Sequence, residues 1–387
     1  MLSTSSARRP PARPPVNLRS AGIQIGVVGF ALVILGMIVA TTVANLASRG
    51  IPIGFDFLWA RAGFTISESV LSYTPDDSNL WAIMVGIGNT IFASSLVIIV
   101  STIAGTLLGI ARLSVNPLVA ALAKVWVETA RNTPLLLLLL FVYTIWWTLP
   151  ADVGGEIVPG VYASMRGLVV PWLEMPWDGR MTALSVMVAL AVLVAARMAA
   201  SRAKARTGRR PSYLPVATTV TLLTFVLVFV VAGGSLDWPE VRGTALTGGI
   251  TLTPETATLL LGLMFYTTGF IAEIVRSGLN AVPKGQWEAS RSLGLPTSRI
   301  LRLIIIPQMM RVIVPPMTSQ YINVVKNSTL AMAVGYNDFM VVMGTIINKT
   351  SRAVEGTVLI IITYLVINLT VSFLMNLYNR RVMIKER

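Results

Sequence analysis

The amino-acid sequence predicts an all-α polytopic membrane protein that crosses the bilayer about eight times. Hydrophobic residues make up 54% of the 387-residue chain and charged residues only 12%, whereas soluble domains carry about 25% charged residues. The mean hydropathy is +0.73. The apolar residues also gather into long stretches, and a helix needs roughly 20 of them to cross a bilayer core of about 30 Å.

Eight stretches are apolar enough for this, and they define the predicted spans. Their approximate boundaries are 21–47, 81–111, 117–149, 181–200, 216–233, 256–275, 304–325 and 354–377. The first follows a basic segment, as in a signal peptide, but it is long and lacks a convincing cleavage site, so we expect an uncleaved anchor. The third contains charged residues before an apolar run at 135–140. This order predicts a cytosolic or interfacial helical lead followed by the span itself.

The distribution of charge predicts the orientation of the chain. If the N-terminus is cytoplasmic, alternation places 20 of the 31 Lys and Arg residues in cytoplasmic segments and seven in the opposite segments. The cytoplasmic segments are then 1–20, 112–116, 197–213, 276–303 and 378–387. Because cytoplasmic loops are enriched in Lys and Arg, both termini are predicted to be cytoplasmic. The net charge of +14 then reflects membrane orientation, and no nucleic-acid partner is expected.

Composition and missing motifs argue against an enzyme. The chain has no Cys and no His, which removes disulfides, thiolate and imidazole metal sites, catalytic triads and histidine proton relays. Neither the phosphate-binding pattern G-x-x-x-x-G-K-[ST] nor the nucleophile pattern G-x-S-x-G occurs. We therefore expect no ATP hydrolysis, no metal and no cofactor in this chain.

Polar residues within or beside the apolar segments are candidates for a substrate pathway, because ionisable groups are costly inside a membrane. The candidates are Asn89, Thr90, Glu128, Arg131, Lys326, Asn327 and Ser328. The alternative is structural, since polar groups also bond neighbouring helices and Glu128 can pair with Arg131 three residues later. Glu273 and Arg276 repeat this spacing, and there we favour structural pairing.

The segment between the sixth and seventh predicted spans carries the most specific pattern. A short helix of good helix formers is predicted to begin with Glu288, Ala289 and Ser290. Gly294 then permits a sharp turn, and Pro296 stops the helix from continuing. The result is a small helix–turn–helix element on the cytoplasmic side. It has a shape suited to a groove in a partner protein, and the alternative is a simple ordered loop.

This segment resembles the E-A-A-x3-G-x9-I-x2-P signature of the permease subunits of bacterial ABC importers. The matching residues are Glu288, Ala289, Gly294, Ile304 and Pro307, and Ser290 replaces the second alanine. The stretches RNTPLL at 131–136, VPKGQ at 282–286 and KNSTLA at 326–331 look like the polar amino-acid permease subfamily, of the histidine and glutamine type. The length and the ending YNRR at 378–381 are most similar to the first permease subunit of general L-amino-acid transporters.

The resemblance implies a type I ABC importer permease fold divided into five regions. These are a disordered cytoplasmic tail (1–20), an extra N-terminal span with a periplasmic loop (21–80), the first part of the permease core (81–149), an insertion with two extra spans and periplasmic loops (150–253), and the second part of the core with a cytoplasmic coupling loop at 281–303 (254–387).

The resemblance also implies partners. A cytoplasmic ATPase dimer, which binds ATP and Mg²⁺, would be coupled to the chain through Glu288, Ala289, Ser290, Gly294 and Pro307. A homologous second permease would complete the pathway in the bacterial inner membrane. A periplasmic binding protein would deliver polar L-amino acids, with broad specificity, for import by alternating access.

Two functions of other classes remain as alternatives. An ion-coupled secondary transporter of small polar solutes needs carboxylates deep in several spans, and only Glu128 and Glu273 qualify loosely. A non-transporting membrane scaffold would use the cytoplasmic helix only as a docking site.

Overall fold

The computed structural model of the chain describes residues 18–382, apart from 49, 51–53, 153, 175–190, 193, 196–197, 200–234 and 244. The predicted tail 1–20 lies outside these residues except for its last three positions. The predicted spans 181–200 and 216–233 also lie outside them, apart from six scattered positions of the first.

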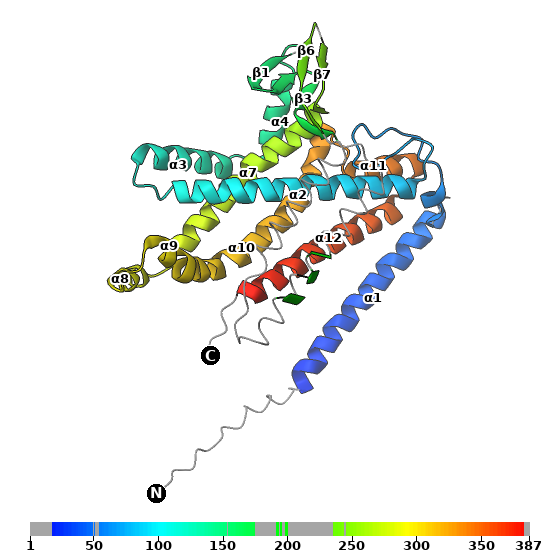
Figure 1. Ribbon diagram of the computed structural model, residues 1–387. Helices are drawn as coiled ribbons and strands as arrows, with labels where there is room; N and C mark the ends of the chain where they lie inside the picture. Colours follow the sequence, from blue (N-terminus) through cyan, green and yellow to red (C-terminus); the bar gives the residue numbers. More distant parts are fainter. Residues whose placement is uncertain are drawn as a thin grey trace.

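The described part of the chain is mostly helical, as predicted (Figure 1). The long apolar helices are α1 (Leu18–Ser48), α2 (Asn79–Ala111), α7 (Pro254–Asn280), α10 (Ile306–Asn327) and α12 (Ala353–Val382). The shorter helices are α3 (Pro117–Asn132), α4 (Leu135–Trp146), α8 (Lys284–Ser292), α9 (Thr297–Ile300) and α11 (Phe339–Thr350). Short segments of other helix types are η1 (Asp56–Trp59), η2 (Leu301–Ile305) and η3 (Ser328–Val334). Among the described residues, five helices are long and apolar enough to cross a membrane.

The third predicted span consists of two helices. α3 and α4 meet at an angle of 107°, because Pro134 has no backbone N–H and forces Thr133 into an extended conformation (φ −94°, ψ 124°). The helical lead that the sequence predicted is therefore α3. α4 has 12 residues, or about 18 Å of helix, so the apolar run alone is too short to cross a bilayer core.

The described residues of the region 150–253 include eight short strands that the sequence analysis did not predict. One antiparallel sheet has the order β1-β2-β3-β8, and two further pairs are β4-β5 and β6-β7. The bounds are β1 (Gly155–Val158), β2 (Val161–Ser164), β3 (Gly167–Val170), β4 (Trp172–Glu174), β5 (Ser235–Asp237), β6 (Glu240–Arg242), β7 (Ala245–Thr247) and β8 (Ile250–Leu252). Strands of three or four residues are too short for their alternation to be recognised. They lie together beside the N-terminal end of α7 (Figure 1).

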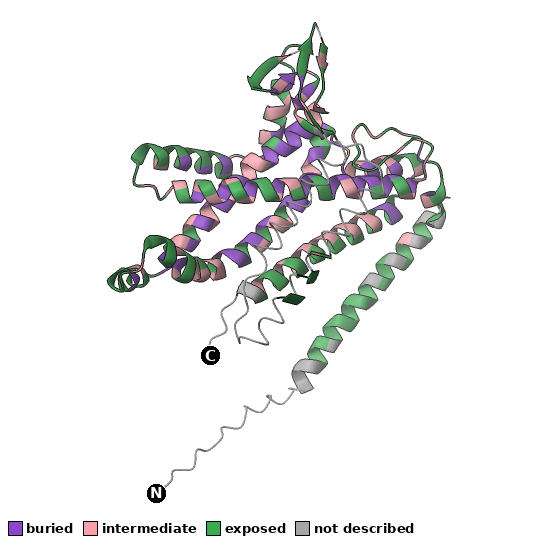
Figure 2. Ribbon diagram, in the orientation of Figure 1, coloured by how far each residue is buried: buried purple, intermediate pink, exposed green. Residues whose placement is uncertain are grey.

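The core of the bundle lies where α2 crosses α7 (Figure 2). Gly105 and Gly109 are four residues apart on one face of α2, and a Cβ atom at either position would lie 2.6–2.7 Å from atoms of α7. Glycine pairs at this spacing allow the backbones of membrane helices to approach closely. By contrast, α1 and α12 expose many large apolar side chains, so these helices present apolar surface to a membrane or to partner subunits.

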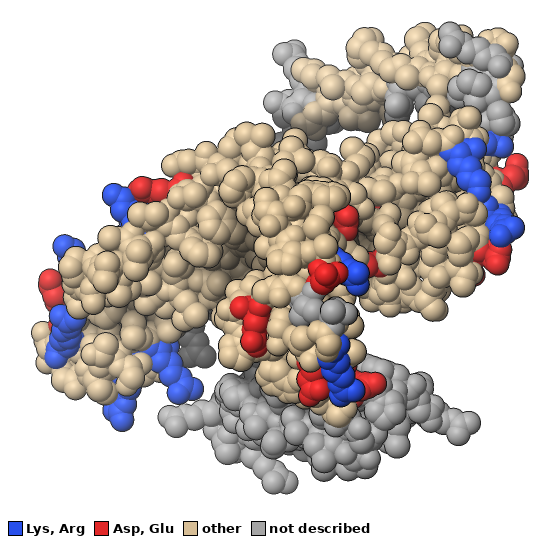
Figure 3. Space-filling view, turned by 90° about the horizontal axis from the view of Figure 1, so that it is seen from above, with Lys and Arg blue, Asp and Glu red and all other residues tan. Residues whose placement is uncertain are grey.

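The two ends of the bundle differ in charge. α8 and α9 lie at one end, with the C-terminal ends of α2 and α7, whereas α11 and the N-terminal ends of α2 and α12 lie at the other (Figure 1). Lys and Arg dominate the end that carries α8 and α9, while acidic side chains gather around the strands (Figure 3).

Candidate functional site

The helix–turn–helix element at the basic end consists of α8, a tight turn and α9. α8 begins at Lys284, one turn earlier than predicted, because Pro283 occupies the N-cap position with a φ of −56° and its ring restricts the chain to the geometry of a helix start. Glu288 is therefore in the middle of α8, and the prediction that the helix begins with Glu288 is wrong by one turn.

The turn after α8 has the geometry that the sequence predicted. Gly294 has a φ of +67°, a left-handed conformation that glycine adopts without strain. Its N–H donates to the carbonyl of Arg291 at 2.8 Å, and the Leu295 N–H donates to the carbonyl of Ser290 at 3.3 Å. These bonds satisfy carbonyls at the end of the helix. The chain can thus reverse direction within two residues and enter α9.

α8 has an anchored face and a free face. Trp287 packs against a buried cluster formed by Val282, Ile300 and Ile305, and Ser290 is buried, with its hydroxyl donating to the carbonyl of Gln286 at 2.5 Å. Glu288, Ala289, Arg291 and Ser292 are exposed. One side of the helix is therefore fixed to the bundle, and the other side is available for contact.

Pro307 lies in the first turn of α10. The π-helical turn η2 precedes it and continues from α9. The helix–turn–helix element is therefore joined to the bundle by two helices, α7 before it and α10 after it.

A cavity of about 520 Å³ lies next to the anchored face of α8. Its lining comes from the end of α2, the α2–α3 connection, the start of α3, the end of α7, and α8: Ile110, Ala111, Leu113, Ser114, Val119, Leu279, Asn280 and Trp287. The space separates α8 from the α2–α3 connection.

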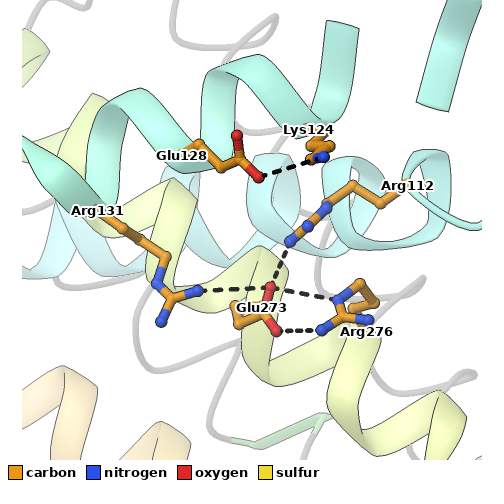
Figure 4. A network of polar contacts seen from close by, with 6 residues as sticks. All are labelled: Arg112, Lys124, Glu128, Arg131, Glu273 and Arg276. Atoms are coloured by element: carbon orange, nitrogen blue, oxygen red, sulfur yellow. Dashed lines mark hydrogen bonds and ion pairs between the residues drawn. The ribbon is translucent and has the colours of Figure 1, made fainter. Parts of the chain in front are cut away.

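A network of charged residues links α2, α3 and α7 (Figure 4). The Glu273 carboxylate accepts hydrogen bonds from Arg112 and from Arg276, whose Nη2 lies at 2.5 Å. Arg131 lies 3.7 Å from the same carboxylate. The predicted pairing of Glu273 with Arg276 is confirmed.

The predicted pairing of Glu128 with Arg131 is wrong. Glu128 lies 3.7 Å from Lys124 instead, whereas Arg131 reaches across to Glu273 on α7 and stacks over the ring of Phe270, 5.8 Å from its centroid. The side chains of Glu128 and Arg131 therefore leave α3 in different directions (Figure 4).

Asn89 and Thr90 fasten segments at the other end of the bundle. The Asn89 amide donates to the carbonyls of Glu68 (2.9 Å) and Asn337 (2.8 Å), and the Thr90 hydroxyl accepts from the N–H of Phe339 at 3.0 Å. Both side chains are buried. This geometry matches the structural alternative, in which polar groups hold neighbouring segments together.

The stretch 326–328 lies where α10 ends. Lys326 is exposed, Asn327 is partly buried, and Ser328 is buried with its hydroxyl donating to the carbonyl of Val325 at 2.9 Å. The chain continues as the 3-10 turn η3 and reverses at Gly335, which has a φ of +87°. The predicted pathway residues fall in two regions, because Thr90 and Ser328 both lie within hydrogen-bonding reach of Tyr364, whereas Glu128 and Arg131 are on α3.

Asp338 is a buried carboxyl group that the sequence analysis missed. It caps α11 by accepting a hydrogen bond from the N–H of Val341 at 2.9 Å, and the hydroxyl of Tyr364 donates to it at 3.4 Å. Burial raises the pKa of Asp338 to about 6. The capping pattern Asp338-x-x-Val341 at the start of an apolar run was a signal for a helix start.

This carboxyl group makes stability depend on pH. Because the folded chain holds the Asp338 proton more tightly than the unfolded chain, whose reference pKa is 3.8, the contribution of this group is greatest below pH 4 and is lost as the pH rises through about 6. The loss amounts to roughly 3 kcal/mol. We expect Asp338→Asn, which keeps an oxygen to cap α11, to raise the melting temperature at pH 7.5 but not at pH 4. Equal shifts at both pH values in detergent-solubilised protein would contradict this.

No metal site is evident in the part of the chain that the structure describes, since it contains no group of three or more acidic residues placed to hold a cation. Residues 101–384 match the family model of the binding-protein-dependent transport system inner membrane component. The chain belongs to this family, and it is a multi-pass transport permease. Such permeases work with other permease subunits and with separate ATPase subunits.

The relatives cover nearly the whole chain. YhdX of Escherichia coli, named as an amino-acid ABC transporter permease protein, is 40% identical over 96% of both chains. The general L-amino acid transport system permease protein AapQ of Rhizobium johnstonii is 41% identical over 89% of this chain and 88% of its own. The glutamate/glutamine/aspartate/asparagine permease protein BztB of Rhodobacter capsulatus is 37% identical over 96% and 95%.

Among solved structures, the crystal structure of an amino acid ABC transporter with histidines aligns over 78% of this chain and 94% of its own. The sequence identity is 19% and the TM-score is 0.46.

Proposed function

We propose that this chain is one of two homologous permease subunits of an ATP-driven importer for polar L-amino acids. The observation that carries the proposal is a sequence identity of 37–41% to three permeases whose names specify amino-acid transport. The alignments cover 88–96% of the lengths of these relatives. One of these relatives is named for general L-amino acid transport, and another is named for four amino acids. These names support broad specificity. A periplasmic binding protein delivers the substrate, and two cytoplasmic ATPase subunits bind ATP and Mg²⁺.

The proposed orientation places both termini in the cytoplasm and the strands in the periplasm of a bacterial inner membrane. The basic end with α8 and α9 then faces the ATPases. This orientation is consistent with eight spans if the bent pair of α3 and α4 crosses the membrane as one unit, and two of the eight predicted spans lie outside the described residues.

α8 is the proposed coupling helix. Its exposed face, with Glu288 and Ala289, docks on an ATPase subunit, and its anchored face passes the movement to the bundle. Because the cluster of Val282, Ile300 and Ile305 joins α8 to the ends of α7 and α10, displacement of α8 moves both helices. Closure of the ATPases therefore biases the bundle between two states of its pathway.

The substrate pathway is proposed to pass residues that can compensate the charges of a zwitterion. Glu128 on α3 is 54% exposed and can face an ammonium group. Lys326, Asn327 and Ser328 lie at the interrupted end of α10, where a pathway can open toward the periplasm. The second permease contributes the opposite wall.

Two glycines of the coupling element provide a matched test. At both Gly285 and Gly294 a Cβ atom would meet nothing within 4 Å, but only Gly294 has a positive φ. A left-handed conformation costs a residue with a Cβ about 1–2 kcal/mol, so we expect Gly294→Val to lower uptake of radiolabelled glutamine about ten-fold, while Gly285→Val keeps most of the uptake. Glu288→Lys should also abolish uptake, with the chain still in the membrane.

Uptake should also stop when cells are depleted of ATP. Transport that survives ATP depletion but is lost with an uncoupler would instead identify the ion-coupled transporter. Unchanged uptake in Gly294→Val and Glu288→Lys would contradict the role given to α8.

A further inference from the structure

The Glu273 network holds more positive charge than its carboxylate can neutralise. Arg112, Arg131 and Arg276 converge on Glu273, which leaves a net charge of +2, while Lys124 and Glu128 nearby balance each other. We propose that this network is a binding site for the phosphate of an anionic phospholipid from the cytoplasmic leaflet. The proposal rests on the orientation proposed above.

The hydrogen-bonding capacity of the network is also unequal. The three guanidinium groups have about fifteen N–H donors between them, whereas one carboxylate offers roughly four acceptor sites. Arg131 contributes one contact at 3.7 Å to Glu273, which is too long for a good hydrogen bond. Its side chain is 44% exposed, so most of its donors are free to bind a second anion. Guanidinium groups suit phosphate because they can bind two oxygens at once.

The depth of the network favours a lipid over a soluble protein. Glu273 lies seven residues before the end of α7 at Asn280, which corresponds to about 10 Å of helix. Arg112 directly follows α2. In the proposed orientation, this is the level at which hydrocarbon meets headgroups, and basic pockets between helices on the cytoplasmic side are known to bind lipid headgroups.

Apolar side chains exposed on α3 and at the end of α2, the helices that carry Arg131 and precede Arg112, offer a surface for acyl chains. Leu122 and Val125 on α3, and Ile110 and Leu113 at the end of α2, are all exposed. Acidic residues of an ATPase could supply negative charge to Arg131, but they would leave this apolar surface in water. A phospholipid satisfies both features with one molecule.

The lipid also gives the network a mechanical role. Glu273 already ties α7 to α2 and α3, and a phosphate on Arg131 and Arg276 would hold these helices from the membrane side. Because α7 leads directly into the coupling element, the bound lipid would limit how far α7 moves with α8.

Native mass spectrometry of the intact complex, with its second permease and ATPase subunits, tests the proposal. The complex is titrated with phosphatidylglycerol and with phosphatidylcholine. We expect preferential retention of phosphatidylglycerol, reduced about five-fold by Arg131→Gln, since each basic residue near an anionic surface contributes on that scale. Lys124→Gln is the matched control, because it removes one positive charge from the same helix outside the network. Arg276→Gln is the second variant and should lower retention similarly.

Several outcomes would overturn the proposal. Equal losses in Arg131→Gln and Lys124→Gln would show general surface charge. Displacement of phosphatidylglycerol by an excess of inorganic phosphate would show a site for free anions. Release of the ATPase subunits by Arg131→Gln, without lipid preference in the wild type, would show a protein contact. If the chain carries no amino acid but lipid retention still depends on Arg131, the proposed substrate fails and this site stands.

Discussion

Replacing Gly109 by alanine is expected to destabilise the bundle by about 3 kcal/mol, the upper part of the range for overpacked cores. A Cβ atom at this position would lie 2.6 Å from the carbonyl oxygen of Ala272 and 3.0 Å from the Cβ of Val275. Both belong to the body of α7, so neither can rotate away. α2 would have to separate from α7, and the melting temperature and yield of the purified chain should both fall.

Gly344 in α11 supplies the control for this substitution. A Cβ atom there would meet nothing within 4 Å, and alanine normally stabilises the interior of a helix by roughly 0.5–1 kcal/mol relative to glycine. The two alanine variants should therefore shift the melting temperature in opposite directions. If both raise it, α2 and α7 are not in the close contact described above.

Replacing Glu273 by glutamine is expected to destabilise the chain by about 3 kcal/mol, because removing one partner from a mostly buried ionic network leaves uncompensated charge. The carboxylate is 20% exposed, and Arg112, its most buried partner, is 13% exposed. Without the carboxylate, three guanidinium groups would repel one another between α2, α3 and α7. Thermal unfolding in detergent measures the loss.

Glu128→Gln is the matched control for Glu273→Gln. Its side chain is 54% exposed and has one partner, Lys124, at 3.7 Å, so the expected effect is below about 1 kcal/mol. The double variant Glu273→Gln with Arg112→Gln should recover part of the stability, since it removes both a carboxylate and the guanidinium that depends on it. A Glu273→Gln variant as stable as Glu128→Gln would contradict the structural importance of the network.

Patterns within a few residues of the sequence predicted those turns and side-chain pairs that form between residues close together in the chain. The turn at Gly294 and the Glu273–Arg276 pair both arise within a few positions of the sequence, where backbone sterics and helical spacing decide the outcome. α8 begins one turn before the predicted start at Glu288, because Pro283 caps the helix.

Long-range contacts could not be predicted in this way. Arg112 and Glu273 are separated by 161 residues, and no periodicity in the sequence relates them. The predicted pairing of Glu128 with Arg131 was wrong for the same reason. The spacing of these residues along α3 favours the pair, but Arg131 contacts the carboxylate of Glu273 on α7 instead. The pathway candidate Asn89 is another example. Its structural role depends on hydrogen bonds to Glu68 and Asn337, which come from two distant segments of the chain.

The pairing of β4 with β5 has a consequence for the whole chain. Glu174 and Ser235 are opposite each other in this ladder, so the two positions that flank residues 175–234 lie side by side. The ladder fixes the distance between these positions, and this distance does not depend on how many residues connect them. A connection of another length would therefore leave α4 and α7, which precede and follow the strands, in place.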